Sequence, residues 1–230
     1  MPRTFTLAEL IAQVRASGEF LDPYHPDDEV TTRINEGIAE LRDLVIRDNP
    51  DYYVTQATVD LVANQEAYAL PSDFFRLRLV EGKGTDGRYR ELAEFSFGDR
   101  GAYSLAGSSQ DASALVYRVV GSYLRVLPVP TVAVSAGLQL WYTPTATKLV
   151  NLSDTCDGVD GWQEYVVSYA AAQCARKEEQ DSGPYEAGKA AVAGRIKALV
   201  QRRQVAQPAR VRDVVYGAGG LQYRRRLPPP

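Results

Sequence analysis

The fold is decided by a long amphipathic helix that the sequence predicts over residues 26–48, PDDEVTTRINEGIAELRDLVIRD. Its apolar side chains recur every three or four residues, the spacing of one buried helix face, and they are Val30, Ile34, Ile38, Leu41, Leu44 and Val45. Three acidic residues at positions 27–29 favour the positive end of the helix dipole. The pair Asn49-Pro50 ends the helix, because the residue before a proline avoids the helical conformation.

Three further helices are predicted around this one. A short helix over residues 6–16 begins at Thr6, and Glu9 follows at the spacing of a capping box. Helical periodicity returns at Asp160, which we expect to cap the third long helix. After a break at residues 181–184, a last helix is predicted over residues 185–204. Four amphipathic helices bury their apolar faces against one another, so the sequence predicts a helical bundle.

Residues 51–150 have a different pattern, in which short strand-like runs alternate with turns. Two of these runs, 115–120 and 123–127, are predicted to form a hairpin across Gly121-Ser122. We therefore predict an α+β protein that is mainly a helical bundle of about four helices, formed by residues 1–50 and 151–204. A β-rich insertion at 51–150 lies between the second and third long helices, and residues 205–230 form an extended C-terminal arm.

The composition excludes several classes of protein. Of 230 residues, 45% are hydrophobic and 24% are charged, which is typical of a globular protein with a packed core. No run approaches the ~20 apolar residues of a membrane-spanning helix, and the first residues lack the apolar block of a signal peptide. Cys156, Cys174 and the single histidine, His25, are too few for a structural zinc site. We expect two free thiols, as in a reducing cytosol, with Cys174 in the core.

Two stretches resemble ligand-binding motifs and are better explained as turns. Residues 82–85, GKGT, lack the upstream glycine of a phosphate-binding loop, so a hairpin turn is predicted. Residues 154–161, DTCDGVDG, carry cysteine and glycine where a calcium-binding loop places oxygen ligands. No nucleophile or metal motif is present, so the sequence predicts no cofactor and no enzyme, although an unrecognised pair of carboxylates stays as an alternative.

Charge is distributed unevenly along the chain. Residues 202–230 carry seven arginines against one aspartate, a charge of +6, whereas the whole chain is −3, so residues 1–201 carry −9. Aromatic and aliphatic side chains alternate with these arginines, and residues 211–216, VRDVVY, have strand propensity. We interpret the C-terminal arm as a binding segment, with an unfolded solvated terminus as the alternative. Its candidate binding residues are Arg210, Arg212, Tyr216, Leu221, Tyr223, Arg224, Arg225 and Arg226.

Five segments in order along residues 6–200 are distinctive together. They are RINEGIAEL at 33–41, YALPSDFFRL at 68–77, LRVLPVP at 124–130, LQLWYTP at 138–144 and WQEYVVSYAAA at 162–172. In order and spacing, they resemble the head–tail adaptor (connector) proteins of tailed bacteriophages.

The resemblance implies a structural protein of the virion, made in the bacterial cytoplasm and placed at the head–tail junction. It implies a ring, typically a dodecamer, beneath the portal protein, onto which the C-terminal arms dock. A tail-side protein (nozzle, tail terminator or tail tube) would bind the opposite surface, and the genome would pass through the ring without specific binding. The alternative from another class is a small nucleic-acid-binding protein that uses its arginine-rich tail.

Overall fold

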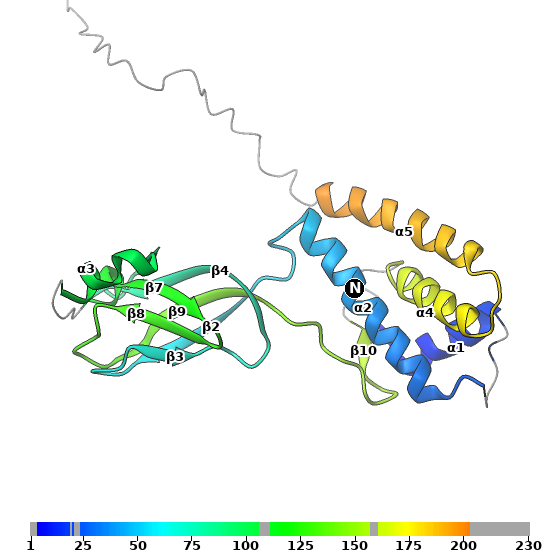
Figure 1. Cartoon of the computed structure of the whole chain (residues 1–230), viewed down its shortest axis with the longest axis horizontal. Helices are drawn as coiled ribbons and strands as arrows, with labels where there is room; N and C mark the ends of the chain where they lie inside the picture. Colours follow the sequence, from blue (N-terminus) through cyan, green and yellow to red (C-terminus); the bar gives the residue numbers. More distant parts are fainter. Residues whose placement is uncertain (1–3, 19, 21–23, 106–110, 157–160, 203–230) are drawn as a thin grey trace, which may run out of the picture.

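A computed structural model describes residues 4–18, 20, 24–105, 111–156 and 161–202. Two regions separate along the chain (Figure 1). The helical region consists of α1 (Leu7–Gly18), α2 (Asp27–Asp48), α4 (Gln163–Lys177) and α5 (Gly183–Arg202). The sheet region, residues 55–144, holds the strands β2 to β9 and the short helix α3 (Arg100–Leu105).

The helical region packs around α4, which contacts α1, α2 and α5. Three fully buried alanines of α4, Ala170, Ala171 and Ala175, permit close approach of the neighbouring helices. At the start of α1, the Thr6 N–H donates to Glu9 Oε2 at 2.9 Å and the Glu9 N–H donates to Thr6 Oγ1 at 3.3 Å. This reciprocal pair is the predicted capping box.

Side-chain contacts between the helices show their relative directions. Tyr165 and Lys177 of α4 bond to Glu40 and Glu29 of α2, so these two helices are antiparallel. Arg176 of α4 likewise bonds to Glu186 near the start of α5, and the chain turns back between them. α2 and α5 are therefore parallel, and both end at the side of the helical region that faces the sheets (Figure 1).

The sheet region contains two four-stranded sheets. The first has the order β2-β9-β4-β5 and is antiparallel throughout, with β2 (Thr55–Leu61), β9 (Val134–Pro144), β4 (Phe74–Lys83) and β5 (Tyr89–Glu91). The second has the order β3-β8-β7-β6, with β3 (Ala67–Ala69), β8 (Tyr123–Leu127), β7 (Val116–Val120) and β6 (Ala93–Glu94), and its β6–β7 pair is parallel. Two 3₁₀ turns, Phe97–Asp99 and Ala112–Ala114, connect the strands.

Each region has its own apolar core. The helical core includes Leu10, Val14, Ile34 and Val166, whereas the core between the sheets includes Val80, Leu124 and Leu140 and other side chains from both sheets. A two-stranded ladder of β1 (Phe5–Thr6) and β10 (Thr155–Cys156) joins the start of α1 to the segment that returns from the sheets.

The predicted fold class, mainly a helical bundle of about four helices, is wrong. The described residues form an α+β structure with five α-helices and ten strands in three sheets. The physical reason is the second core: the alternating runs of the middle segment bury one face of each sheet against the other, so they form a sandwich in their own right. The sheet region is as much a part of the fold as the helices.

Several local predictions are confirmed. The helix predicted at residues 26–48 is α2, and the hairpin across Gly121-Ser122 joins β7 to β8, with Gly121 at φ +60°. Residues 82–85 belong to a hairpin in which the Gly84 N–H donates to the Arg88 carbonyl at 2.8 Å. The last helix begins two residues earlier than predicted, at Gly183, because Pro184 is tolerated in a first helical turn.

Candidate functional site

The chain crosses between the two regions at residues 49–54 and 145–149. Side-chain hydrogen bonds hold each crossing to a neighbouring strand or helix. In the first, the Asp51 carboxylate accepts from Arg78 Nε of β4 at 2.9 Å. In the second, Asn35 Nδ2 of α2 donates to the Leu149 carbonyl at 3.0 Å, and the Leu149 N–H donates back to Asn35 Oδ1 at 2.8 Å. We call these crossings and the adjacent face of α2 the junction.

Arg42 of α2 lies at the centre of the junction. Its Nη2 donates to the Pro144 carbonyl at the end of β9 at 2.8 Å, and its guanidinium lies 4.2 Å from the centroid of the Tyr53 ring. The Arg42 side chain therefore joins α2 to the outgoing crossing and to the last residue of the returning strand. Hydrogen bonds from a charged donor and stacking on an aromatic ring both stabilise this arrangement.

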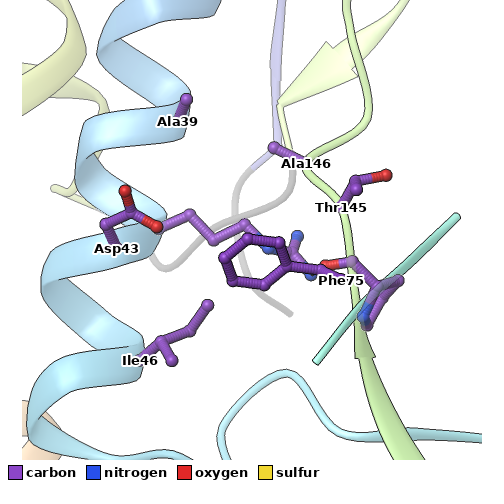
Figure 2. Close-up of a pocket in the computed structure, with 8 residues that line it drawn as sticks. Ala39, Asp43, Ile46, Phe75, Thr145 and Ala146 are labelled. Carbon is purple, nitrogen blue, oxygen red and sulfur yellow. The ribbon is translucent and has the colours of Figure 1, made fainter. Parts of the chain in front are cut away.

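A pocket of about 290 Å³ opens beside Arg42 (Figure 2). The Phe75 ring extends toward α2 there, although 54% of this residue remains exposed. The wall combines apolar groups with one cation and one carboxylate, and its residues are Ala39, Arg42, Asp43, Ile46, Phe75, Pro144, Thr145 and Ala146. Such a lining suits an apolar or aromatic side chain from another protein.

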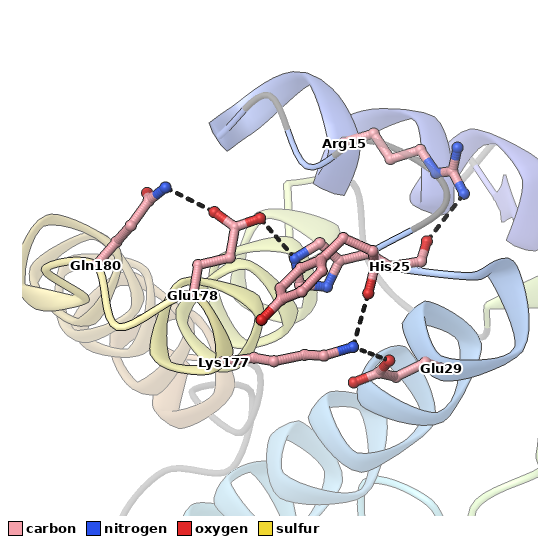
Figure 3. Close-up of polar contacts among 7 residues, drawn as sticks. Arg15, His25, Glu29, Lys177, Glu178 and Gln180 are labelled. Carbon is pink, nitrogen blue, oxygen red and sulfur yellow. Dashed lines mark hydrogen bonds and ion pairs between the residues drawn. The ribbon is translucent and has the colours of Figure 1, made fainter.

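A polar cluster closes the far end of the helical region (Figure 3). The fully buried His25 ring contacts Glu178 through Nε2, 2.8 Å from Oε1. Lys177 Nζ donates to the Tyr24 carbonyl at 2.7 Å and to Glu29 at 2.6 Å, and Arg15 donates to the His25 carbonyl at 3.2 Å. These bonds fasten the α1–α2 connection to the end of α4, so the cluster explains the packing of three helices.

Several ionisable side chains lie between the packed helices, and their pKa values are shifted by burial and by neighbouring groups. Burial, followed by a hydrogen bond to Glu40, raises the pKa of Tyr165 far above its ordinary value. Burial alone would lower the pKa of Lys189, but hydrogen bonds and charges from Glu186 and Glu40 raise it. Burial raises the pKa of the Cys174 thiol to about 11, so the thiol is protonated at neutral pH, and its predicted position in the core is confirmed.

The family model for the SU10 adaptor protein matches residues 5–212. The chain belongs to the SU10 adaptor protein family. No curated protein matches this chain. The match spans the helical region, both crossings and the whole sheet region, and the predicted membership of a phage head–tail adaptor family is confirmed.

The segment YALPSDFFRL at 68–77, one of the five on which the resemblance rests, has a structural role. The buried Tyr68 hydroxyl donates to the Gln65 carbonyl at 3.0 Å and accepts from the Val62 N–H at 3.1 Å, which fixes the β2–β3 turn. Asp73 accepts from the Tyr142 hydroxyl at 2.9 Å, and Phe74 stacks on the Tyr142 ring. The motif thus anchors the start of β4 against β9 beside the junction.

Asp154, in the stretch that resembled a calcium-binding loop, has its hydrogen-bond partners within its own turn. Asp154 accepts from the Val150 and Asn151 N–H groups, each at 2.8 Å, so its carboxylate closes its own turn. These hydrogen bonds lower the pKa of Asp154. Residues 157–160, including the predicted cap Asp160, lie outside the described residues. Over the described part of the chain, no three His, Cys, Asp or Glu residues gather closely enough to hold a metal ion, and no helix is both long and apolar enough to span a membrane.

All eight candidate binding residues of the C-terminal arm, from Arg210 to Arg226, lie outside the described residues, so their role stays a prediction. Sequence reasoning missed Arg42, Phe75 and the contact between His25 and Glu178. Arg42 lies in the predicted helix and Phe75 in the segment at 68–77, and no sequence pattern indicates that the two side chains lie close together. His25 and Glu178 are 153 residues apart, and only the fold brings them together.

Proposed function

We propose that this chain is the head–tail adaptor of a tailed phage virion, linking the portal at the capsid vertex to the tail. Copies form a ring, typically a dodecamer, beneath the portal, with a central passage for the genome. The observation that carries the proposal is the SU10 adaptor family match over residues 5–212, which includes both regions of the fold. The protein acts as a structural part, without catalysis or cofactor.

The charge distribution supports the proposed passage for DNA. Residues 1–201 carry a charge of −9. An acidic lining repels the phosphates weakly, and this repulsion keeps a moving genome from adhering. A ring requires a heterologous interface that repeats around an axis. Exposed apolar side chains in both regions, such as Phe75 and Phe97 in the sheet region and Leu199 in α5, provide contact area for neighbouring subunits or a tail-side protein.

The place where the C-terminal arm begins supports its proposed role in portal docking. α5 ends at Arg202 beside the junction, on the side where α2 also ends. The arm is therefore attached beside the junction, and its +6 charge and tyrosines are suited to binding along a protein surface.

The direct test is removal of residues 205–230. We expect a folded chain that no longer binds a purified portal ring in a sedimentation assay, because the docking segment is gone. A matched control removes only Pro228 to Pro230 and leaves the seven arginines in place, so it should bind. If the chain lacking 205–230 binds the portal with unchanged affinity and salt dependence, the proposed docking role of the arm is wrong.

The arginine-rich tail also supports a second candidate function, nucleic-acid binding. That function predicts affinity for duplex DNA that falls steeply with salt, with a slope set by the number of phosphates neutralised. The adaptor proposal instead predicts weak DNA binding for the whole chain, because its body is acidic. A salt titration by fluorescence anisotropy with a 30-base-pair duplex (a length of about three helical turns) separates the two.

A further inference from the structure

The edges of the sheets differ greatly in length. Within the described residues, the edge strands β3 and β5 have three residues each, and β6, β1 and β10 have two. The remaining edge strand, β2, has seven residues, Thr55–Leu61. Short edges offer few unpaired backbone groups to another chain, whereas a seven-residue edge offers a complete row. β4 also extends beyond β5 over residues 74–79, but that segment carries two charges, Arg76 and Arg78, and two register shifts.

The sequence of β2 does nothing to protect this edge. Proteins usually shield long edges with charged residues, prolines or bulges, yet residues 55–59, TQATV, contain no charge and no proline. The one charged residue, Asp60, lies at the far end, where its carboxylate accepts from the Ala136 N–H at 2.6 Å beside the register shift. The regular part of the strand, from Thr55 to Val59, is open to pairing.

The outward backbone groups of β2 have no partner in the described part of the chain. β9 is the one strand that pairs with β2, and the backbone hydrogen bonds outside the ladders do not involve residues 55–61. The side chains of β2 alternate: Ala57 and Val59 pack against the sheet core, while Gln56 and Thr58 lie on the outer face, where Gln139 Nε2 donates to Gln56 Oε1 at 2.9 Å. An added strand would extend both faces of the sheet.

One segment of this chain fits the open edge in composition and reach. Residues 211–216, VRDVVY, include three valines and a tyrosine, which favour strands. They follow the end of α5 by nine residues, a span of up to about 30 Å at ~3.3 Å per extended residue. α5 ends beside the junction, where Thr55 begins β2, so the attachment point of the segment is at the near end of the open edge.

We propose that residues 211–216 of the same copy add to the edge of β2 as a parallel strand in the free protein. A parallel orientation follows from the topology, because β2 begins at the junction and the arm is attached there, at the end of α5. The tether supplies a high effective concentration, on the order of millimolar, so the same-copy contact is favoured over pairing between molecules. The strand covers the open edge until the arm binds elsewhere.

This inference rests on the proposed portal-docking role of the arm and adds a regulation to it. A segment that pairs with β2 cannot also extend onto the portal, so docking must displace it. The free energy of the β2 contact is therefore subtracted from the affinity for the portal. While the arm covers β2, the free chain also lacks an open strand edge through which copies could pair prematurely.

The test is a disulfide between the edge and the arm. Thr58→Cys is combined in turn with Asp213→Cys, Val214→Cys or Val215→Cys, because adjacent strands bring Cα atoms within about 7 Å, as a disulfide requires. Native Cys156 and Cys174 are buried, and a Thr58→Cys chain without an arm cysteine controls for their participation. The matched control places the cysteine at Arg90 of β5, the opposite edge of the same sheet.

We expect at least one Thr58 pairing to give a monomeric cross-linked chain under mild oxidation, and the Arg90 pairings to give none. Disulfide-linked dimers, or equal cross-linking at Thr58 and Arg90, would overturn the same-copy strand. These measurements contain no portal, so they can fail while the portal-docking proposal stands.

The proposed displacement has its own readout. The cross-linked chain should lose at least tenfold in portal affinity relative to the same chain after reduction with dithiothreitol. Equal affinity before and after reduction would show that pairing with β2 does not compete with docking, and would overturn the regulation.

Discussion

The helical region and the sheet region differ in how completely each one satisfies its own backbone. In α2, α4 and α5, the interior N–H and carbonyl groups bond within the same helix, and ion pairs such as Lys177–Glu29 join one helix to the next. In the sheet region, the outer side of β2 pairs with no other strand among the described residues. The backbone groups of these helices are thus already paired, whereas the sheet region has an edge at which a further strand can add.

The two regions also differ in how they reach close packing. Alanines of α4 bring helices together, whereas Gly82 of β4 lets the turn at Ala112–Ala114 approach the first sheet. The junction joins these two kinds of packing through Arg42, Asp51 and Asn35. We therefore expect that a substitution in one core lowers the stability of that region first, and that the junction couples the unfolding of the two regions.

The largest expected effect comes from cutting into one core at a time. The chain has two tryptophans, and each region holds one: Trp141 in β9 and the buried Trp162 before α4. In denaturant unfolding, Leu140→Ala should lower the free energy reported by Trp141 by about 2–5 kcal/mol, and Ile34→Ala should lower that reported by Trp162 by a similar amount. Trp141→Phe and Trp162→Phe backgrounds isolate each fluorescence signal.

The same experiment can show that the two cores are not independent. If both substitutions lower both transitions equally, the two cores unfold as one cooperative unit, and the division into a helical region and a sheet region has no energetic meaning.

A smaller effect is expected from closing the gap at Gly82. A Cβ at this position would lie 2.1 Å from the Ala112 carbonyl oxygen, a backbone atom that cannot turn away. Gly82→Ala should therefore destabilise the sheet region by about 1–3 kcal/mol, the usual cost of overpacking. Gly101→Ala in α3 is the control, because its Cβ would meet nothing within 4 Å. Thermal unfolding followed by Trp141 should separate the pair; equal stability of the two variants would contradict the assigned role of Gly82.

Removing the central side chain of the junction tests how strongly the two regions are coupled. Arg42→Ala loses the bond to Pro144 and the contact with Tyr53, which should cost about 1–2 kcal/mol. The midpoints reported by Trp141 and Trp162 should move further apart, because less of the junction couples them. Arg47→Ala, an exposed position of the same helix, should leave both midpoints in place. Equal shifts for the two arginines would show that Arg42 does not connect the regions.

The smallest effect at neutral pH is expected at Cys174. Its pKa is raised to about 11 in the folded helical region, above the ordinary value near 9, so folding favours the protonated thiol. This contribution is complete below about pH 8 and is lost as the pH rises through 9 to 11. The stability difference between the natural chain and Cys174→Ala should therefore be constant from pH 6 to 8 and shift against the natural chain toward pH 11, measured by urea unfolding. A difference that stays constant across this range would contradict the raised pKa.

Local structure was predictable where neighbouring residues determine it. Thr6 and Glu9 form the expected capping box, and Gly121-Ser122 turns the expected hairpin. The fold class was wrong because alternation in single strands does not reveal that two sheets share a core of their own, between residues as distant as Leu61 and Leu140. Contacts such as His25 with Glu178, and Arg42 with Pro144, join residues more than a hundred positions apart, and sequence patterns carry no signal for them. The binding residues of the arm stay a prediction.

The central claim, that this chain is a structural adaptor that assembles on a portal, is tested most directly by mass. Native mass spectrometry or light scattering would measure the full chain alone and after mixing with a purified portal ring. We expect a single chain in the absence of the portal, and a complex in which copies add to the portal in fixed stoichiometry. A portal ring whose mass does not change, together with salt-sensitive binding of the chain to duplex DNA, would contradict it.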